Sequence, residues 1–478
     1  MIYDVLVIGG GVIGCMTARE LSKYKLLVCL AEKQNDVAVG ATKANSGIIH
    51  GGYDPIPNTL KARLNAKGVE KLFEAAEMLN VPYRKNGSLV CAFGKEEEQE
   101  IYTLFERGRQ NGISGLRIIS GDEARKIEPE LSEEVTLALQ VQNAGIISPY
   151  KLAIASMGNA MDNGVAFERN FEVTDISKNE EGVFVVTSND GKELMCRYLI
   201  NCAGAYSGII SKMAGGEEYN IIPRAGEYML LDKTEGKTVS HTIFQVPTKA
   251  GKGVLVTPTA DGNLLLGPTA AQVEYSDNTN TTSKGLSDVS LLVKKSVPNV
   301  DLSKVITSFT GVRASIEGGD FIIEESKTVG GLINAVAIDS PGLTCCVAIA
   351  EYIVNLLRKS GLPLESRSDW NGFRTSEDTF YKLDDNQKNE FIKTHAAYGR
   401  IICRCEGITE GEIRACLRQN PPAWDMDGVK RRTRTGMGRC QGGFCSPYVI
   451  KLISEELGIP MEEVTKKGGK SYMLTGRL

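Results

Sequence analysis

The amino-terminal glycine motif constrains the fold of this chain more than any other feature. A strand-like apolar run at residues 3–8 leads directly into the sequence GGGVIG at residues 9–14. Gly9 allows a tight turn from strand to helix, Gly11 allows the backbone to approach a diphosphate, and Gly14 allows the helix to pack closely against the sheet. The motif therefore predicts a parallel sheet with an anion site at the start of the following helix.

The residues after the motif extend this prediction to a dinucleotide-binding unit. A helix is expected over Val12–Lys23, and a second apolar strand, Leu26–Ala31, ends at Glu32. A carboxylate in this position accepts hydrogen bonds from ribose hydroxyls. Strand, turn, helix, strand and acidic residue occur in the expected order, but NAD and FAD share this fingerprint.

Length, charge and composition describe a multidomain protein without a membrane span. The 478 residues correspond to about three domains of typical size. A net charge of −4 gives no general reason to expect nucleic-acid binding. There is no positively charged leader and no long uninterrupted apolar window. We therefore expect a cytoplasmic protein, and peripheral association with a membrane stays open.

Three later segments are suited to enclose a flat ring system. The first, residues 40–53, combines small residues with an isolated histidine, and the second, residues 197–207, is an apolar strand that ends in small residues. The third, residues 338–344, lies between an expected strand, Ile333–Ile338, and an expected helix, Cys345–Arg358. Its backbone N–H groups at a helix start could hold an extended polar chain. Ordinary glycine-rich turns are the alternative interpretation of the first and third segments.

The middle of the chain predicts a second, mostly antiparallel sheet. Alternating apolar stretches at residues 226–232 and 253–258 are typical of strands. Asp261-Gly262-Asn263, followed by an apolar run, is a hairpin signal. The lysine-bearing turn at residues 249–253 is a further candidate anion contact, although a solvated loop is the simpler interpretation.

Histidines supply the candidate catalytic bases. His50 ends the first small-residue segment, His241 precedes an expected strand, and His395 lies in a linker-like stretch and is expected to be inert. A neutral imidazole can take the hydroxyl proton of an alcohol while the carbinol carbon gives up a hydride. His50 and His241 are therefore candidate catalytic residues, with a structural hydrogen bond as the alternative role for each.

Four cysteines near the carboxyl terminus form two closely spaced pairs, Cys403/Cys405 and Cys440/Cys445. Four thiolates can hold either zinc or an iron–sulfur cluster, and the spacing alone does not decide between them. Between the pairs lies a basic run at residues 430–439. It predicts either a docking face beside a metal centre or a solvated loop.

The glycine-rich phrases resemble those of the FAD-dependent oxidoreductases of the D-amino-acid oxidase superfamily, over most of residues 1–365. This resemblance implies FAD in an extended conformation, with its ADP half on the glycine motif and Glu32. Arg313, in the phrase FTGVRAS, resembles the arginine that holds an anionic substrate over the flavin, and a surface ion pair is its alternative role. The implied FAD-binding residues are Gly9, Gly11, Val12, Ile13, Gly14, Glu32, Lys33, Thr42, Asn45, Ser46, Gly47, Ile49, Val173, Ala203, Gly204, Gly342, Leu343 and Thr344.

The cysteine end resembles the bacterioferritin-associated-ferredoxin-like [2Fe-2S] domains in the phrases CRCEGITEGEI and GMGRCQGGFC. This resemblance implies that Cys403, Cys405, Cys440 and Cys445 hold a [2Fe-2S] cluster. The expected fold class is thus α/β, with a Rossmann-like FAD-binding domain, a mixed antiparallel-sheet substrate domain and a small helical iron–sulfur domain. The expected segments are a FAD-binding domain (1–80, 145–215 and 306–365), a substrate domain (81–144 and 216–305), a linker (366–395), a [2Fe-2S] domain (396–457) and a tail (458–478).

The combination of both domains is similar to the catalytic subunits of anaerobic glycerol-3-phosphate dehydrogenases. The phrases SGIIHGGY and PRAGEY resemble the L-2-hydroxyglutarate oxidase branch equally well. Both resemblances imply oxidation of a small anionic secondary alcohol by hydride transfer to flavin N5, with glycerol 3-phosphate as the first expectation. L-2-hydroxyglutarate, or another 2-hydroxy or amino acid, is the alternative substrate.

The resemblance also implies a partner that takes the electrons from the cluster, either an electron-transfer flavoprotein or another subunit. A different class of function stays open as well. In that case the chain is a non-catalytic flavin and iron–sulfur subunit that only relays electrons.

Overall fold

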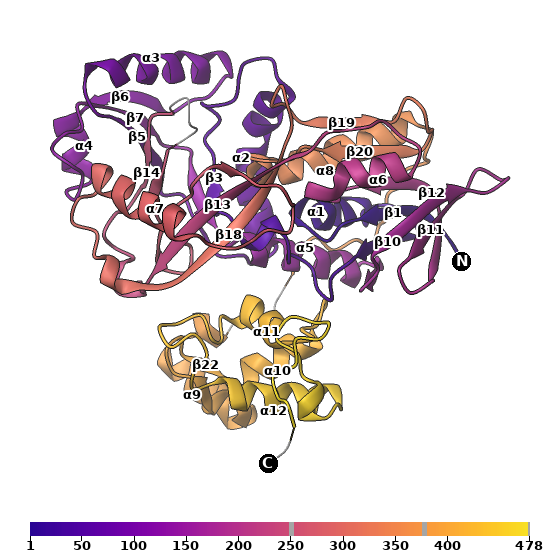
Figure 1. Cartoon of the computed structure of the whole chain (residues 1–478). Coiled ribbons are helices and arrows are strands. Elements are labelled where there is room, and N and C mark those ends of the chain that lie inside the picture. The colour runs from indigo at the N-terminus through magenta and orange to yellow at the C-terminus, as the bar shows by residue number, and fades with distance from the viewer. Residues whose placement is uncertain (248–252, 375–379, 477–478) are drawn as a thin grey trace.

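The computed structural model describes residues 1–247, 253–374 and 380–476, which form two large sheets with their helices and a carboxy-terminal domain (Figure 1). Residues 249–252 of the lysine-bearing turn lie outside the described residues. Within the described ranges, none of the helices combines the length and the apolar character that a membrane span requires.

The first sheet is built on the glycine motif. Its order is β9 (Ala166–Arg169), β2 (Val28–Glu32), β1 (Ile2–Ile8), β12 (Glu193–Asn201), β11 (Phe184–Ser188) and β10 (Val173–Lys178), with β20 (Leu332–Val336) paired to β12 and β19 (Ile322–Glu325) paired to β20. The neighbours from β9 through β12 to β20 are parallel. Helices cover these strands, so both faces are buried, which explains the continuous apolar run of β1.

Four helices pack around this sheet and around one another: α1 (Val12–Leu21), α2 (Leu60–Met78), α5 (Pro149–Asp162) and α8 (Gly342–Lys359). The strand–turn–helix–strand unit expected at the amino terminus is confirmed. Helix α8 begins at Gly342, three residues earlier than expected, so the predicted loop at 338–344 includes the first turn of this helix. The carboxyl ends of the parallel strands and the start of α1 therefore meet at one edge, where dinucleotides bind in such folds.

The second sheet is mixed and lies beside the first in Figure 1. Its order is β17 (Ala271–Gln272), β13 (Ile222–Leu231), β16 (Leu264–Gly267), β15 (Leu255–Pro258), β14 (Thr242–Gln245), β5 (Ser88–Ala92), β7 (Leu137–Val141) and β6 (Leu116–Ser120), with β18 (Val305–Ser315) paired to β13. Helices α3 (Lys95–Gln110), α4 (Gly121–Ile127) and α7 (Ser283–Ser296) contact its strands. The hairpin signal at Asp261–Asn263 is confirmed, because β15 and β16 are antiparallel neighbours around it.

Strand β18 crosses the expected domain boundary at residue 305. It pairs along its length with β13 of the second sheet and then leads back to the first sheet. We propose that the substrate domain includes this strand. A small third sheet of β3 (Ile48–Ile49), β8 (Gly145–Ile147) and β4 (Tyr83–Arg84) lies where the two large parts meet.

The carboxy-terminal domain is small and mostly helical. It contains α9 (Asp385–Thr394), β21 (Ile401–Cys403), β22 (Ile408–Thr409), α10 (Glu410–Arg418), α11 (Met426–Thr433) and α12 (Ser446–Leu457). Ile413, Val429 and Ile453 are fully buried in its core. Thr409 and Glu412 cap α10 through reciprocal side-chain hydrogen bonds. Figure 1 shows this domain below the rest of the chain, with α11 as its nearest helix.

The basic run at 430–439 is neither a solvated loop nor an open docking face in its first half. Arg431, Arg432 and Arg434 are between 5 and 8% exposed. Arg432 forms a two-pronged ion pair with Asp36, at 2.7 and 2.9 Å, and Arg431 adds a contact of 2.5 Å to the same carboxylate. The prediction failed because a charge pattern does not reveal an acidic partner on a distant loop.

Replacing Asp36 by asparagine is expected to loosen the attachment of the carboxy-terminal domain. Removing one partner of a buried ion pair strands the remaining charge, which costs about 3–5 kcal/mol. Burial alone would raise the pKa of Asp36, but Arg432 and then Arg431 lower it by more, so the pKa lies below its ordinary value. The stabilisation is therefore present above the unfolded-state pKa and is lost as pH falls through the lower folded-state value.

Urea unfolding of wild type and Asp36→Asn at several pH values measures this effect. The difference in the free energy of unfolding should be full near neutral pH and should shrink under acidic conditions. Asp369→Asn is the matched control, because its pair with Arg367 is exposed and worth at most about 1 kcal/mol. Equal stability of Asp36→Asn and wild type at neutral pH would contradict the account.

Candidate functional site

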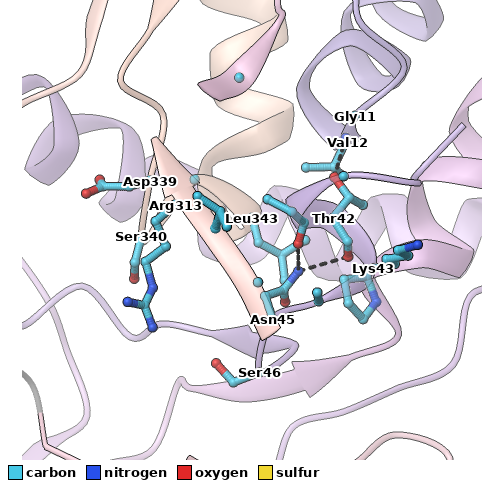
Figure 2. Close-up of a pocket in the computed structure, with 18 of the residues that line it drawn as sticks. Gly11, Val12, Thr42, Lys43, Asn45, Ser46, Arg313, Asp339, Ser340 and Leu343 are labelled. Atoms are coloured by element: carbon cyan, nitrogen blue, oxygen red, sulfur yellow. Dashed lines mark hydrogen bonds between the residues drawn. The ribbon is translucent and has the colours of Figure 1, made fainter. Parts of the chain in front are cut away.

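A large cavity of about 2180 Å³ runs between the first sheet, the second sheet and α11. Its volume exceeds the range of about 300–1,000 Å³ that is typical of sites for drug-sized ligands. Figure 2 shows Gly11, Val12 and Thr42 on one side of it and Arg313, Asp339 and Ser340 on the other. The cavity has room for an extended dinucleotide together with a small substrate.

The glycine motif forms the nucleotide end of this cavity. Gly9 has a positive φ of 108°, and a Cβ there would lie 2.5 Å from the Cys202 carbonyl oxygen. A Cβ on Gly11 would meet nothing closer than Thr42 Oγ1 at 3.4 Å, so the backbone is open toward the cavity. Thr42 Oγ1 also accepts a hydrogen bond of 3.0 Å from the Val12 N–H at the start of α1. This arrangement fits the diphosphate of FAD.

Glu32 lies where the fold requires a ribose contact, at the carboxyl end of β2. Its Oε2 accepts a hydrogen bond of 2.6 Å from Gly10, and its Oε1 accepts one of 2.9 Å from Gln34. Burial raises the pKa of Glu32, although both backbone donors act in the opposite direction. The half-buried carboxylate is thus held in position by the backbone of the loops that it faces.

Most of the predicted FAD-binding residues line the cavity. They are Gly9, Gly11, Val12, Ile13, Glu32, Lys33, Thr42, Asn45, Ser46, Gly47, Val173, Ala203, Gly204, Gly342 and Leu343. The loop between η1 (Ala41–Lys43) and β3 owes its shape to Asn45, whose Oδ1 accepts from the Gly47 N–H at 2.8 Å and whose Nδ2 donates to the Thr42 carbonyl at 2.9 Å.

Three predicted FAD-binding residues do not line the cavity. Gly14 packs against the turn, where an added Cβ would lie 1.9 Å from the Gly9 carbonyl oxygen. Ile49 is fully buried in the core. Thr344 is also fully buried, and its Oγ1 accepts a hydrogen bond of 2.9 Å from the His50 N–H. Gly14 supports the site by allowing α1 to approach the turn, and Ile49 and Thr344 support it with side chains that are buried in the protein interior.

His50 is the predicted base that the structure places in the cavity. Its Nε2 lies 3.3 Å from the Ser340 hydroxyl, and its ring centroid lies 5.9 Å from that of Phe244. Two backbone contacts fix the residue itself, since Thr344 accepts from its N–H and Asn65 donates to its carbonyl oxygen.

His241 is not part of the cavity lining, which corrects its assignment as a candidate base. Its Nδ1 lies 2.6 Å from Glu128, and the same carboxylate accepts from the backbone N–H groups of Ser240 and His241. Glu128 is 2% exposed. The histidine thus takes part in a group of hydrogen bonds to the Glu128 carboxylate at the start of β14. This is the structural role that the sequence left open as the alternative.

Arg313 lies in the cavity wall and has a second arginine beside it. On paired antiparallel strands, Arg313 of β18 is directly opposite Arg224 of β13, and both line the cavity. Arg313 Nη2 lies 3.4 Å from the Thr269 carbonyl oxygen. A Cβ on Gly226 would lie 2.5 Å from this guanidinium, so a side chain at Gly226 would displace the Arg313 head group. Like charges in such a pair repel, and an anionic ligand removes the repulsion.

Arg224 was not predicted as a site residue from the sequence, although it lies in the phrase PRAGEY that carries a family resemblance. The sequence also did not predict that the carboxy-terminal domain forms part of the cavity wall. The residues of this part are Asp427, Lys430, Arg431, Arg434, Met437 and Gln441. The spacing of the first four is that of one helix face, but this pattern does not say what the face covers. Tyr150 joins the two parts, with its hydroxyl 3.4 Å from Arg434 and 3.7 Å from the Met437 sulfur.

The four predicted cluster ligands lie as two thiol pairs. The Cys405 thiol is 3.6 Å from Cys440, and the Cys445 thiol donates a hydrogen bond to Cys403. This bond and burial raise the pKa of Cys445, while the same bond, helped by the N–H groups of Gly436 and Glu406, lowers the pKa of Cys403. Cysteine thiolates that receive backbone N–H bonds suit a [2Fe-2S] cluster, so the donor set fits this group.

Comparison with known families agrees with both ends of the chain. A model of the FAD dependent oxidoreductase family matches residues 4–356, and a model of the BFD-like [2Fe-2S] binding domain matches residues 401–455. A glycerol 3-phosphate dehydrogenase of Caloramator mitchellensis is 46% identical over 474 residues, which are 99% of this chain and 98% of that protein. A mitochondrial L-2-hydroxyglutarate dehydrogenase of Mus musculus is 29% identical and covers 72% of this chain and 86% of its own length.

A solved structure is similar over most of the chain. Dithionite-reduced L-α-glycerophosphate oxidase from Mycoplasma pneumoniae, with FAD bound, superimposes with a TM-score of 0.75 at 33% identity, over 78% of this chain and 98% of that one. The α/β fold class and both cofactor expectations are thereby confirmed. The chain belongs to the FAD dependent oxidoreductase family, with a BFD-like [2Fe-2S] binding domain at its carboxyl end, and FAD and a [2Fe-2S] cluster are its cofactors.

Proposed function

We propose that the chain is a dehydrogenase that oxidises sn-glycerol 3-phosphate to dihydroxyacetone phosphate. The observation that carries the proposal is the pair of arginines, Arg224 and Arg313, in the same cavity as His50. Two arginines at one paired position of neighbouring strands suit a doubly charged phosphate monoester. The identity of 46% to a glycerol 3-phosphate dehydrogenase, over almost the whole chain, favours this substrate.

The chain's own residues divide the work between binding and proton transfer. Arg313, supported by Arg224, holds the phosphate and so fixes the carbinol carbon in the cavity. His50 takes the hydroxyl proton at Nε2, where the Ser340 hydroxyl, 3.3 Å away, can accept a hydrogen bond from the new N–H. The O–H and C–H bonds break and the C=O bond forms, so the alcohol loses one proton to His50 and one hydride, which carries the two electrons.

The cofactors supply the redox chemistry. FAD, when bound, accepts the hydride, and the [2Fe-2S] cluster supplies one-electron transfer to an acceptor outside the chain. Residues of the cluster loop reach the FAD cavity: Gln441 follows Cys440 directly and lines the cavity. The electron acceptor is proposed to be a partner protein that accepts single electrons.

L-2-hydroxyglutarate is the second candidate substrate. The similarity to mitochondrial L-2-hydroxyglutarate dehydrogenase favours it, and two carboxylates would also suit two arginines. The mechanism is unchanged, because both molecules are anions that carry a secondary alcohol.

Anaerobic mixing of the full chain with each substrate tests the proposal. We expect glycerol 3-phosphate to bleach the flavin absorption rapidly, and L-2-hydroxyglutarate to bleach it much more slowly. Faster bleaching by L-2-hydroxyglutarate than by glycerol 3-phosphate would indicate that L-2-hydroxyglutarate is the substrate. Absence of bleaching with both would leave only the electron-relay function, in which the flavin is reduced by a partner and no small alcohol is oxidised.

A further inference from the structure

Helix α11 presents one charged face to the FAD cavity. Asp427, Lys430 and Arg431 follow one another at the spacing of adjacent helical turns, Arg434 lies directly after the end of the helix, and all four line the cavity. The ion pairs of Asp36 with Arg431 and Arg432 hold the helix in this position. The carboxy-terminal domain thus closes part of a cavity whose other walls belong to the FAD-binding and substrate domains.

Arg431 carries a hydrogen-bond donor without a partner. The residue is 5% exposed, and its Nη2 contacts Asp36 at 2.5 Å, but its Nε is buried and has no hydrogen-bond partner among the described residues. Because this Nε has no accessible surface toward the cavity, Arg431 can act on a ligand there through the positive charge of its guanidinium rather than through this N–H.

Positive charge is concentrated at the same place. Lys43 directly follows Thr42, which contacts the start of α1, and Lys43 lines the cavity together with Lys430 and Arg431. Loss of hydration and then the charge of Arg431 lower the pKa of Lys43. Loss of hydration likewise lowers the pKa of Lys430, with the charges of Lys466, Arg431 and Arg434 adding to the effect and Asp427 opposing it. A cluster of like charges at the anion-binding end of a helix is stabilised by a bound anion.

We propose that the BFD-like domain completes the FAD site, with Lys430 and Arg431 of α11 contacting the diphosphate-bearing half of FAD. Lys430 supplies a positive charge to the phosphate oxygens, and the guanidinium of Arg431, which Asp36 holds in place, supplies a second. The domain therefore has two roles, because it holds the cluster and also retains FAD. This inference depends on the cofactor and not on which alcohol is oxidised.

Retention of FAD by the full-length holoenzyme tests the proposal. FAD fluorescence after dilution gives the release rate and the dissociation constant, and iron content shows whether the carboxy-terminal domain is still folded. Lys430→Glu is expected to raise the dissociation constant of FAD about tenfold or more, because one charge-assisted contact is lost and a repulsion is added. Lys430→Gln should give a smaller increase in the same direction.

Lys451→Glu is the matched control, because this lysine lies on α12 of the same domain, is 66% exposed and does not line the cavity. It should leave FAD retention unchanged. Should Lys430→Glu lose iron, Lys430→Gln with full iron content decides the question. FAD retention equal to wild type in an iron-replete Lys430 variant would overturn the proposal.

Discussion

Replacing Arg313 by alanine is expected to lower kcat/KM for glycerol 3-phosphate by a factor on the order of 10²–10³. Arg313, which lies opposite Arg224, is proposed to hold the phosphate, and truncating one partner of a desolvated charge pair costs about 2–5 kcal/mol. Because the contact also fixes the carbinol carbon, we expect KM to rise and the rate of flavin bleaching at saturation to fall. Stopped-flow reduction under anaerobic conditions separates these two effects.

The control for Arg313 is Arg109→Ala, because Arg109 lies on α3 and its side chain is 64% exposed. This variant should behave like wild type. Arg313→Lys keeps the charge but loses the planar guanidinium, so its kcat/KM should lie between the values of wild type and Arg313→Ala. If Arg313→Ala were reduced by substrate as fast as wild type, the proposed role of Arg313 in holding the phosphate would be wrong.

Replacing His50 by glutamine is expected to lower kcat by about 10²–10⁴-fold, which is the usual contribution of a positioned general base. Substrate binding should change little, because the proposed phosphate contacts, Arg224 and Arg313, come from another part of the cavity. FAD absorbance of the purified variant should also be retained, since the imidazole is proposed to act on the substrate proton.

The other two histidines provide matched controls. His241→Gln removes a partner of Glu128 outside the cavity, and His395→Gln changes the end of α9. Both should leave kcat close to wild type, although His241→Gln is expected to lower thermal stability. An equal loss of kcat in His50→Gln and His241→Gln would contradict the assignment of the base.

The predictable parts of the fold are those whose characteristic residues lie close together in the sequence. The turn at Gly9–Gly14 requires glycine because Gly9 has a positive φ and Gly14 lies against the Gly9 carbonyl oxygen. Glu32 follows at the spacing of a strand–helix–strand unit. The four cysteines likewise identify a metal-binding domain by short phrases. In each case the residues that carry the signal are near neighbours along the chain.

The parts that failed depend on contacts between distant segments. His50 and His241 have similar chemistry, and only the position of Glu128, 113 residues away from His241, separates a candidate base from a structural histidine. The burial of α11 likewise depends on a distant contact, because its arginines pair with Asp36 at a separation of almost 400 residues. Arg224 was missed because the register of β13 against β18 decides that it stands beside Arg313.

An anaerobic titration of the full chain with glycerol 3-phosphate, followed by absorption and by electron paramagnetic resonance, tests the central claim most directly. Each alcohol supplies two electrons, and the flavin and cluster together take up three, so about 1.5 equivalents per chain should complete the reduction. We predict that the flavin bleaches and that the signal of a reduced [2Fe-2S] cluster develops in the same titration. A flavin that stays oxidised, or a bleached flavin beside a cluster that stays oxidised, would contradict the account.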